Sequence, residues 1–261
     1  MKNEQEIEKR RKIAVKAARQ AGKILCENLG SKLKVKSKGD RNLVSNVDLK
    51  AENIIIGFIT EYFPQDDILS EETPFRPTGA LFRWVIDPLD GTHNYIKAME
   101  VFGTSIALAM GDEVVMGVIY MPVMKELYEA QKGKGAYKNS KKIKVSNKKL
   151  SESVMIFDSS IRINKKPMLG SLGRLADEVF NIRMFGSTAR SLTYVAEGKA
   201  EMEIEYNDSV WDFAAGLLIV EEAGGRATDF NGHKWNLNTR NYVASNGVVH
   251  KEVLERLRFG R

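Results

Sequence analysis

Residues 84–92 (WVIDPLDGT) constrain this chain more than any other segment, because a short apolar run there leads directly into two aspartates. The first three residues have the aromatic and β-branched composition of a buried strand. A proline and a glycine then turn the backbone, so that the carboxylates of Asp87 and Asp90 converge while the carbonyl between them points outward. Clustered oxygens of this kind suit a hard cation, Mg²⁺ above all.

Further acids accompany this segment elsewhere in the chain. Glu71 and Glu72 follow the apolar residues 68–69, and Asp212 stands at the head of an apolar helix predicted over residues 213–223. Each acid has an ordinary structural interpretation, as part of a turn, as solvated surface or as a helix N-cap. Together they are poorly explained by structure alone, because a cluster of like charges raises its own energy unless cations occupy it.

The composition indicates a folded, soluble protein. The 261 residues are 43% hydrophobic, which allows a substantial core and excludes a disordered chain. The single cysteine, Cys26, excludes a disulfide-stabilised scaffold. Residues 1–25 contain no apolar signal segment, and no apolar run approaches the roughly 20 residues that a membrane span requires. We therefore expect a cytoplasmic protein that makes no membrane contact.

The net charge of +6 is concentrated in two basic stretches. Residues 32–41 carry five basic residues and one acid, and residues 132–149 carry eight lysines and no acid. Such lysines are typical of solvated loops and of edge strands, where they prevent edge-to-edge pairing. The alternative is a nucleic-acid surface on a regulatory protein. We favour the first interpretation, and nucleic acid is not an expected partner.

The apolar pattern predicts two lobes, residues 1–150 and residues 151–261, with net charges of +7 and −1. The first lobe is expected to be a mainly antiparallel sheet flanked by helices, and the second a mixed α/β lobe. Helices are expected up to about Gly30 and at residues 48–63, 169–180, 188–197 and 212–223. Strands are expected at residues 82–86, 102–110, 114–120, 126–130, 154–157, 182–185 and 201–206.

Three segments resemble the signature motifs of the inositol monophosphatase family. They are residues 71–72 (EE), residues 87–92 (DPLDGT) and residues 211–216 (WDFAAG), and residues 222–225 (EAGG) follow them. The resemblance implies an αβαβα sandwich, which is a layered fold of the α+β and α/β type. It also implies a Mg²⁺-dependent, Li⁺-sensitive sugar phosphatase that forms a homodimer.

The resemblance further implies a centre of two or three Mg²⁺ ions. The first site would use Glu71, Asp87 and the carbonyl of Leu89. The second would use Asp87, Asp90 and Asp212, and Glu71 would also orient the attacking water. Two such cations bind phosphoryl oxygens, lower the pKa of the water and stabilise the leaving alkoxide, so that no protein nucleophile is needed.

The resemblance assigns the remaining catalytic roles to Asp48 and Thr92, which would form the relay that activates the water. Backbone N–H groups at Gly91 and Thr92 would bind the phosphate. Further substrate contacts would come from Asp90, Gly186, Ser187, Thr188 and Glu205. The alternative for Glu205 is an ordinary exposed glutamate on a strand that also carries Glu201 and Glu203.

Two basic residues are additional candidates. Lys36 resembles a lysine that lies near the metals on a mobile loop of the family. Arg190 follows Ser187 by one helical turn, so it could meet a second phosphate of the substrate. The other interpretation of Arg190, which we favour, is an ion pair on the surface of the helix.

The sequence therefore predicts a Mg²⁺-dependent phosphomonoesterase that hydrolyses inositol 1-phosphate and related sugar phosphates. Residues 94–95 (NY) resemble the branch that contains inositol monophosphatases and archaeal-type fructose-1,6-bisphosphatases. Fructose-1,6-bisphosphatase, as the main or a dual activity, is the enzymatic alternative. The non-enzymatic alternative is a nucleic-acid-associated regulatory protein that uses the basic stretches.

Overall fold

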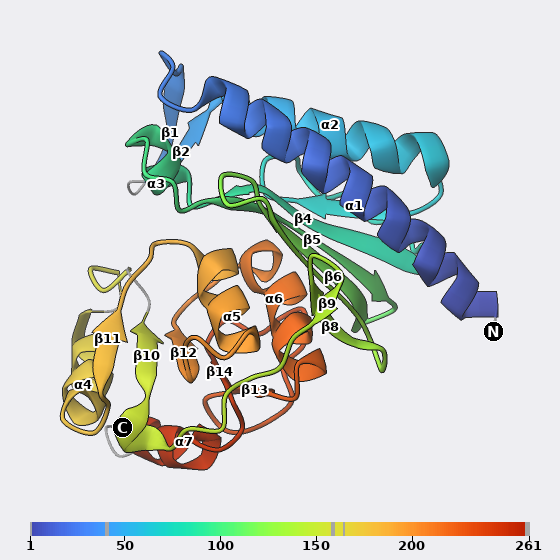
Figure 1. The fold of residues 1–261 in the computed structure, drawn as a ribbon. Helices are drawn as coiled ribbons and strands as arrows, with labels where there is room; N and C mark the ends of the chain where they lie inside the picture. Colours follow the sequence, from blue (N-terminus) through green and yellow to red (C-terminus); the bar gives the residue numbers. More distant parts are fainter. Residues whose placement is uncertain (1, 40–41, 158–159, 164, 259–261) are drawn as a thin grey trace.

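Helices and sheets alternate in five layers across the part of the chain that the computed structural model describes, residues 2–39, 42–157, 160–163 and 165–258 (Figure 1). Two outer helical layers enclose two sheets, and a middle helical layer separates the sheets. From one outer layer to the other, the helices are α1 (Lys2–Asn28) with α2 (Asn46–Tyr62), α5 (Thr188–Ala196) with α6 (Val210–Glu222), and α4 (Lys165–Ala176) with α7 (His250–Arg258). The predicted αβαβα sandwich is confirmed.

The larger sheet has seven strands in the order β3-β4-β5-β6-β7-β8-β9. β3 and β4 are parallel, and the other neighbouring strands are antiparallel, as predicted for the first 150 residues. The strands are β3 (Asp67–Ser70), β4 (Phe82–Asp90), β5 (Gly103–Met110), β6 (Glu113–Met121), β7 (Glu126–Gln131), β8 (Gly135–Lys138) and β9 (Lys141–Lys142). A separate antiparallel pair, β1 (Val35–Gly39) and β2 (Asn42–Ser45), precedes α2.

The smaller sheet has five strands in the order β11-β10-β12-β14-β13. It is mixed, because β10 runs parallel to both of its neighbours while β14 runs antiparallel to both of its neighbours. The strands are β10 (Val154–Phe157), β11 (Asn181–Arg183), β12 (Met202–Glu205), β13 (Arg226–Asp229) and β14 (Tyr242–Ser245). The 3-10 helix η1 (Leu150–Glu152) lies between the two groups of strands. A division of the chain near residue 150 stays a prediction.

Helix α4 begins and ends earlier than the predicted residues 169–180. Pro167 is the third residue of this helix, where its missing N–H would have no intrahelical partner in any case, so a proline is tolerated there. The segment after Ala176 leaves the helix and exposes Phe180, which is 75% exposed. Phe180 therefore belongs to a connection, while its neighbour Val179 still packs against the core.

Helix α1 confirms the amphipathic helix predicted at the start of the chain. Ala17, Ala21 and Leu25 are buried on the face that packs against α2 and the larger sheet. Small side chains on this face let α1 and α2 approach each other closely. The opposite face is charged, and among the described residues we find no helix that combines the length and the apolar composition needed to cross a membrane.

The middle layer is the most deeply buried, since both sheets cover it. A Cβ atom added at Gly117 of β6 would lie 2.7 Å from the backbone oxygen of Ala215 in α6, so only glycine permits this approach. Residues 213–220 of α6 are buried. This contact brings α6 directly against the larger sheet. The start of α6 lies near the end of β4, where Asp212 meets Asp87 and Asp90.

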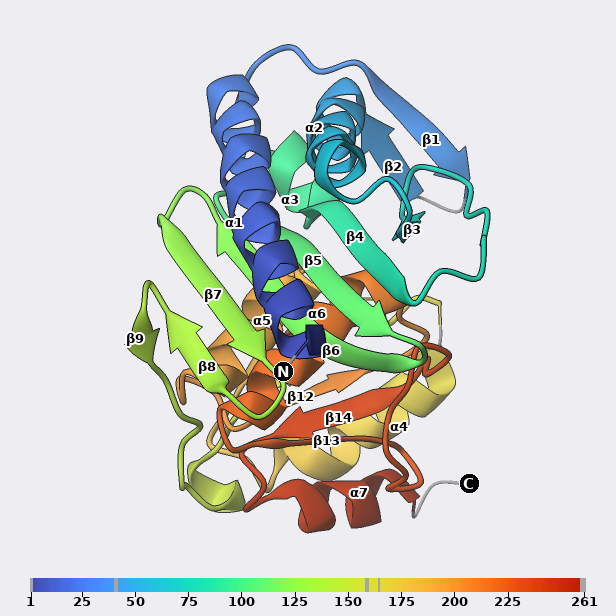
Figure 2. The same cartoon turned by 90° about the vertical axis from the view of Figure 1, so that its right-hand side faces the viewer.

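The lysine-rich stretch 132–149 lies at one edge of the larger sheet, where β9 is the terminal strand (Figure 2). Lys141 and Lys142 on this strand are exposed. Other members of the stretch form ion pairs, as Lys134 does with Glu4 at 2.9 Å. The predicted edge position is confirmed, and it agrees with the role of lysine in blocking edge-to-edge pairing.

His250, the first residue of α7, is buried between two hydroxyl groups. Its Nδ1 lies 2.8 Å from Ser245 Oγ, and its Nε2 lies 2.9 Å from Thr228 Oγ1. Burial, together with the nearby positive charge of Arg226, lowers the pKa of His250 to about 4. The imidazole is therefore neutral in the folded protein at pH values where an unfolded chain would already protonate it.

We expect this histidine to make the fold sensitive to acid. Its contribution to stability is complete above the unfolded pKa of about 6.5 and is lost as the pH falls through about 4, a loss of about 3 kcal/mol. Urea unfolding from pH 7 to pH 4 will measure it, and His250→Gln should reduce the dependence on pH. The exposed His233 supplies the control His233→Gln. Equal pH dependence in both variants would contradict the prediction.

Candidate active site

The motif aspartates belong to β4, which continues to Asp90 and does not end at residue 86 as predicted. The pairing of β4 with β5 shifts register between Asp87 and Asp90, so a bulge replaces the predicted turn. The hydroxyl of Thr104 donates to the carbonyl oxygen of Pro88 at 3.0 Å, which joins the two strands where proline lacks an N–H. Strand pairing therefore holds both carboxylates rigidly.

Gly91 ends the strand with a backbone that only glycine adopts readily. Its φ is +85°, and an added Cβ would lie 2.8 Å from the carbonyl oxygen of Val101. The short helix α3 (Thr92–Ile96) begins directly after it. The left-handed glycine therefore lets Asp90 and Thr92 face the same cavity, which both of them line.

Three aspartates form a compact cluster of the type that holds metal ions. Asp87, Asp90 and Asp212 each offer a carboxylate oxygen, and these oxygens all lie within 4.8 Å of one another. Burial, followed by the charges of Glu71 and Asp212, raises the pKa of Asp87 well above its usual value. Burial also raises the pKa of Asp90 to about 7. Hard oxygen donors whose mutual repulsion a cation would relieve fit Mg²⁺.

Asp212 is not the N-cap of α6, which was one interpretation of its position. Ser209 is the N-cap, and Asp212 occupies the third helical position, where one of its oxygens accepts a hydrogen bond from the Ser209 N–H at 3.3 Å. Helix capping and membership of the acidic cluster are therefore compatible, because a carboxylate has two oxygens. The helix end positions the acid for the cluster.

Asp48 occupies the equivalent capping position in α2 and lies behind Thr92. One of its oxygens accepts from the Ser45 N–H at 3.0 Å, and the other lies 3.2 Å from Thr92 Oγ1. The Thr92 hydroxyl also lies 3.0 Å from the carbonyl oxygen of Leu89, so its single proton has two acceptors nearby. Burial raises the pKa of Asp48. The predicted relay residues are thus in contact.

The predicted substrate residues lie on the other side of the cluster, at the start of α5. The Ser187 hydroxyl and the Thr188 N–H both donate to Asp90, the second at 3.0 Å. The Thr188 hydroxyl donates to Glu205 on β12 at 3.3 Å. Glu205 is only 9% exposed, so the alternative of an exposed strand glutamate is wrong. A buried carboxylate facing a polar cavity is suited to binding hydroxyl groups.

These residues surround one cavity of about 280 Å³. Its lining includes most of the predicted site residues, namely Glu71, Asp87, Leu89, Asp90, Gly91, Thr92, Gly186, Ser187, Thr188, Glu205 and Asp212. Asp48 does not line the cavity itself but contacts Thr92, which does. Residues from β4, α3, α5, β12 and α6 therefore meet, although they lie far apart in the sequence.

The two basic candidates lie outside this lining. Lys36 is exposed on β1. Arg190 is 1% exposed and forms an ion pair with Glu126 at 2.9 Å. The guanidinium does not line the cavity, and its contact with a second substrate phosphate stays a prediction. The ion pair that we favoured is present, but it is buried and does not lie on the helix surface. The reason is that Glu126, which is 64 residues away in sequence, lies beside it in the fold.

One polar residue of the site, Asp208, carried no signal that the sequence analysis used. Asp208 lines the cavity, accepts from the Tyr242 hydroxyl at 3.1 Å, and has its pKa raised to about 7, mainly by burial. An aspartate directly before Ser209 is typical of the start of a helix, so its position in the sequence gave no separate indication of a site. The amide nitrogen of Asn94 lies 2.8 Å from the carbonyl oxygens of Val101 and Phe185, which ties α3 to the segment before α5.

The comparisons with known proteins agree with this arrangement. A sequence model of the inositol monophosphatase family matches residues 6–260. The chain belongs to the inositol monophosphatase family. Membership of this phosphatase family confirms the predicted resemblance, and it makes the acidic cavity the candidate active site of a phosphoric monoester hydrolase.

Other members of the inositol monophosphatase family are similar over nearly the whole chain. The fructose-1,6-bisphosphatase/inositol-1-monophosphatase of Thermotoga maritima is 34% identical over 244 residues, which cover 93% of each chain. The Nus factor SuhB of Escherichia coli K12 is 36% identical over 252 residues and 94% of each chain. The crystal structure of the extragenic suppressor protein suhB from Bartonella henselae superimposes with a TM-score of 0.92 at 35% identity, covering 96% of this chain and 98% of that one.

Proposed function

We propose that this protein is a Mg²⁺-dependent phosphomonoesterase that hydrolyses inositol 1-phosphate and related sugar phosphates with water as the nucleophile. One observation carries the proposal: the aspartate cluster and the buried Glu205 carboxylate share a single cavity. The cluster suits the phosphate end of such a substrate, and the glutamate suits a hydroxyl-rich end. The homodimer, the cytoplasmic location and the inhibition by Li⁺ that the resemblance implies belong to the same proposal.

The metal ions would be held by residues that already face one another. Glu71, Asp87 and the carbonyl of Leu89 would hold one ion, and Asp87, Asp90 and Asp212 a second. When bound, these cations would neutralise phosphoryl oxygens and lower the pKa of the attacking water. The raised pKa values of Asp87 and Asp90 support this assignment, because nearby positive charge would favour the ionised carboxylates.

The chain's own groups would orient the water and the substrate. Glu71 and the Thr92 hydroxyl would bind the water, and Asp48 would accept the proton of the Thr92 hydroxyl. On the opposite side, the Thr188 hydroxyl holds Glu205, which would accept a hydrogen bond from a substrate hydroxyl. Each role uses a group that stands in the cavity or directly behind it.

Fructose-1,6-bisphosphatase remains the second candidate activity, and the name of the Thermotoga maritima relative favours it. The Arg190 guanidinium is paired with Glu126 and does not line the cavity, so we propose that other residues would bind a second phosphate of the substrate. The ratio of the two activities should therefore be unchanged in Arg190→Ala. A selective loss of fructose-1,6-bisphosphatase activity would return Arg190 to the substrate site.

The proposed function is tested by phosphate release from a panel of phosphate esters, with Mg²⁺ and after its removal by a chelator. The panel should contain inositol 1-phosphate, fructose 1,6-bisphosphate, an adenosine phosphate and an aryl phosphate. We expect Mg²⁺-dependent turnover, fastest on the sugar and polyol esters. No turnover of any ester above that of a buffer blank would overturn the proposal.

Glu205→Gln is expected to separate polyol substrates from simple ones. The amide is a weaker acceptor than a carboxylate, so kcat/KM for inositol 1-phosphate should fall by about 10- to 100-fold, corresponding to one lost charged hydrogen bond. An aryl phosphate offers no polyol hydroxyl and serves as the internal control, with kcat/KM nearly unchanged. Equal losses on both substrates would contradict the assignment of Glu205 to the substrate hydroxyl.

A further inference from the structure

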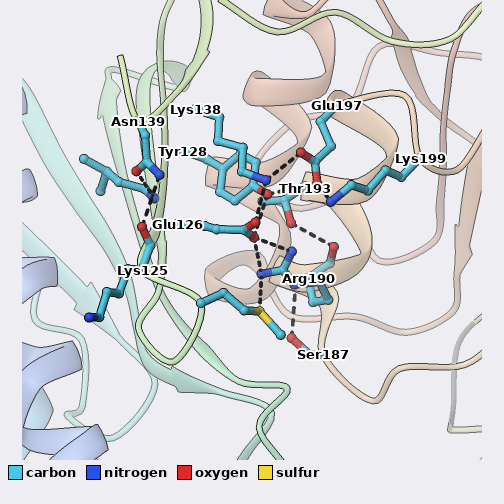
Figure 3. A network of polar contacts seen from close by, with 12 residues as sticks. Lys125, Glu126, Tyr128, Lys138, Asn139, Ser187, Arg190, Thr193, Glu197 and Lys199 are labelled. Carbon is cyan, nitrogen blue, oxygen red and sulfur yellow. Dashed lines mark hydrogen bonds and ion pairs between the residues drawn. The ribbon is translucent and has the colours of Figure 1, made fainter. Parts of the chain in front are cut away.

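Helix α5 is attached to the β7–β8 pair at both of its ends by ion pairs, and the Arg190 side chain in one of them is fully buried (Figure 3). In its first turn, both terminal nitrogens of Arg190 lie 2.9 Å from Glu126 Oε2 at the start of β7. At its last turn, Glu197 accepts from Lys138 Nζ at 2.8 Å. Tyr128 stands between the two ends, and its hydroxyl lies 3.0 Å from a carboxylate oxygen of each glutamate.

The attachment at Arg190 lies next to the acidic cluster. The Arg190 N–H donates to the Ser187 hydroxyl oxygen at 3.2 Å, and that hydroxyl donates to one oxygen of Asp90. The Thr188 N–H donates to the other oxygen of Asp90 at 3.0 Å. The first turn of α5 is therefore held between β7 on one side and the carboxylate at the end of β4 on the other.

The Arg190 side chain has a single, well-defined environment. Its guanidinium lies 4.6 Å from the centre of the Tyr194 ring, and Nη2 also lies 3.1 Å from Met124 Sδ. Burial alone would raise the pKa of Glu126, but hydrogen bonds from Lys138 and Arg190 outweigh it and lower that pKa to about 2. The pair is thus fully charged at neutral pH.

A buried ion pair contributes little to the stability of a fold, but it can fix the orientation of the two side chains that form it. Removing two charges from water costs as much as their attraction returns, so apolar side chains of similar size would stabilise the helix equally well. Here, in contrast, both terminal nitrogens of Arg190 contact one oxygen of Glu126, and Lys138 Nζ lies 2.5 Å from the other oxygen. Charge-assisted contacts on both oxygens fix the direction of the carboxylate. The position of this pair, one turn from Ser187, indicates what it orients.

We propose that the Arg190–Glu126 ion pair positions Ser187 and Thr188, and that these two residues in turn hold the Asp90 carboxylate in the orientation that binds the metal ion. The inference rests on the proposed metal centre. Arg190 is a positioning residue, since it does not line the cavity. Groups that orient metal ligands typically alter metal affinity by 10- to 100-fold when they are removed.

The test compares two ion pairs on the same helix by isothermal titration of Mg²⁺ alone into the full-length protein. Arg190→Ala removes the pair beside Ser187, and we expect the Kd for Mg²⁺ to rise about tenfold. Glu197→Gln is the matched control, because it breaks the pair at the far end of α5, about 15 Å along the helix from Ser187. Its Kd should stay within twofold of the wild type, although its thermal midpoint should fall.

Further variants make the outcome decisive. Ser187→Ala should weaken Mg²⁺ binding as well, and its combination with Arg190→Ala should be no worse than the more severe single variant, because both act on Asp90. If Arg190→Ala does not fold, Glu126→Gln tests the same ion pair, since it keeps the size of the side chain and removes its charge. The Kd for Mg²⁺ should then rise in Glu126→Gln.

Two results would overturn the inference, and they differ from each other. If the wild type binds Mg²⁺ and Arg190→Ala binds it within twofold as tightly, the ion pair is only structural and the metal centre stands. If the wild type binds no Mg²⁺, the metal centre itself is wrong and this inference falls with it. Additive losses from Ser187→Ala and Arg190→Ala would exclude the connection through Ser187.

Discussion

Asp87→Asn is expected to lower Mg²⁺-dependent phosphate release from inositol 1-phosphate by at least about a thousandfold, because charge stabilisation by a metal pair supplies several kcal/mol. Asp87 is the ligand that both proposed ions share, it is 1% exposed, and strand pairing on both sides of the bulge fixes it. An amide of the same shape keeps the fold and removes the negative charge. The loss should therefore appear in kcat and in the Mg²⁺ requirement together.

A matched variant separates this effect from a general change in charge. Asp112 lies exposed in the turn between β5 and β6, so Asp112→Asn removes one negative charge outside the cavity. Its activity should equal that of the wild type. Activity of Asp87→Asn within tenfold of the wild type would show that the cluster is not the catalytic metal centre.

Mg²⁺ is expected to stabilise the protein strongly against heat. At a concentration of 100 times its Kd, a ligand that binds only the folded state contributes about 2.7 kcal/mol, which corresponds to a rise in Tm of about 5–10 °C for a chain of this size. The acidic cluster exists only in the folded chain, because α6 and β4 bring its members together. Thermal unfolding with Mg²⁺ and with a chelator measures the shift.

Without metal, the same cluster should weaken the fold. Burial and neighbouring negative charges raise the pKa of Asp87, so its ionised form is unfavourable in the folded protein at neutral pH. Asp87→Asn should therefore have a higher Tm than the wild type in chelator, and it should lose most of the Mg²⁺-induced shift. Asp112→Asn should behave as the wild type in both conditions. A full Mg²⁺ shift in Asp87→Asn would contradict the proposed ligand set.

The order of the elements could be predicted because it depends on local patterns, whereas most residues of the cavity were assigned through the family resemblance. Apolar runs, turns and helix starts mark most strands and helices. In the motif at residues 87–92, two aspartates three residues apart follow an apolar strand, and this spacing indicates a cation site. The assignment of Glu71 and Asp212 to the same place came from the family resemblance. The structure then placed these residues around one cavity.

Arg190 shows why other features could not be predicted. Its sequence neighbours indicate a helix one turn after Ser187, and this placement is right. Its guanidinium pairs with Glu126, which belongs to β7 of the larger sheet. No periodicity in either segment specifies that partner, so the sequence analysis placed the ion pair on the helix surface and not in the interior. The burial of Glu205 has the same origin, because the layers that cover β12 come from distant parts of the chain.

The sequence by itself determined most helices and strands and the acidic motif at residues 87–92, because motif spacing and apolar periodicity are properties of short segments. The resemblance of its motifs implied the family, the layered fold and the set of metal ligands. Only the tertiary structure decided how those carboxylates are held. It showed the bulge between Asp87 and Asp90, the capping contact of Asp212, and the ion pair that braces the first turn of α5. These features depend on contacts between residues that are far apart along the chain, and such contacts form only when the layers close over one another.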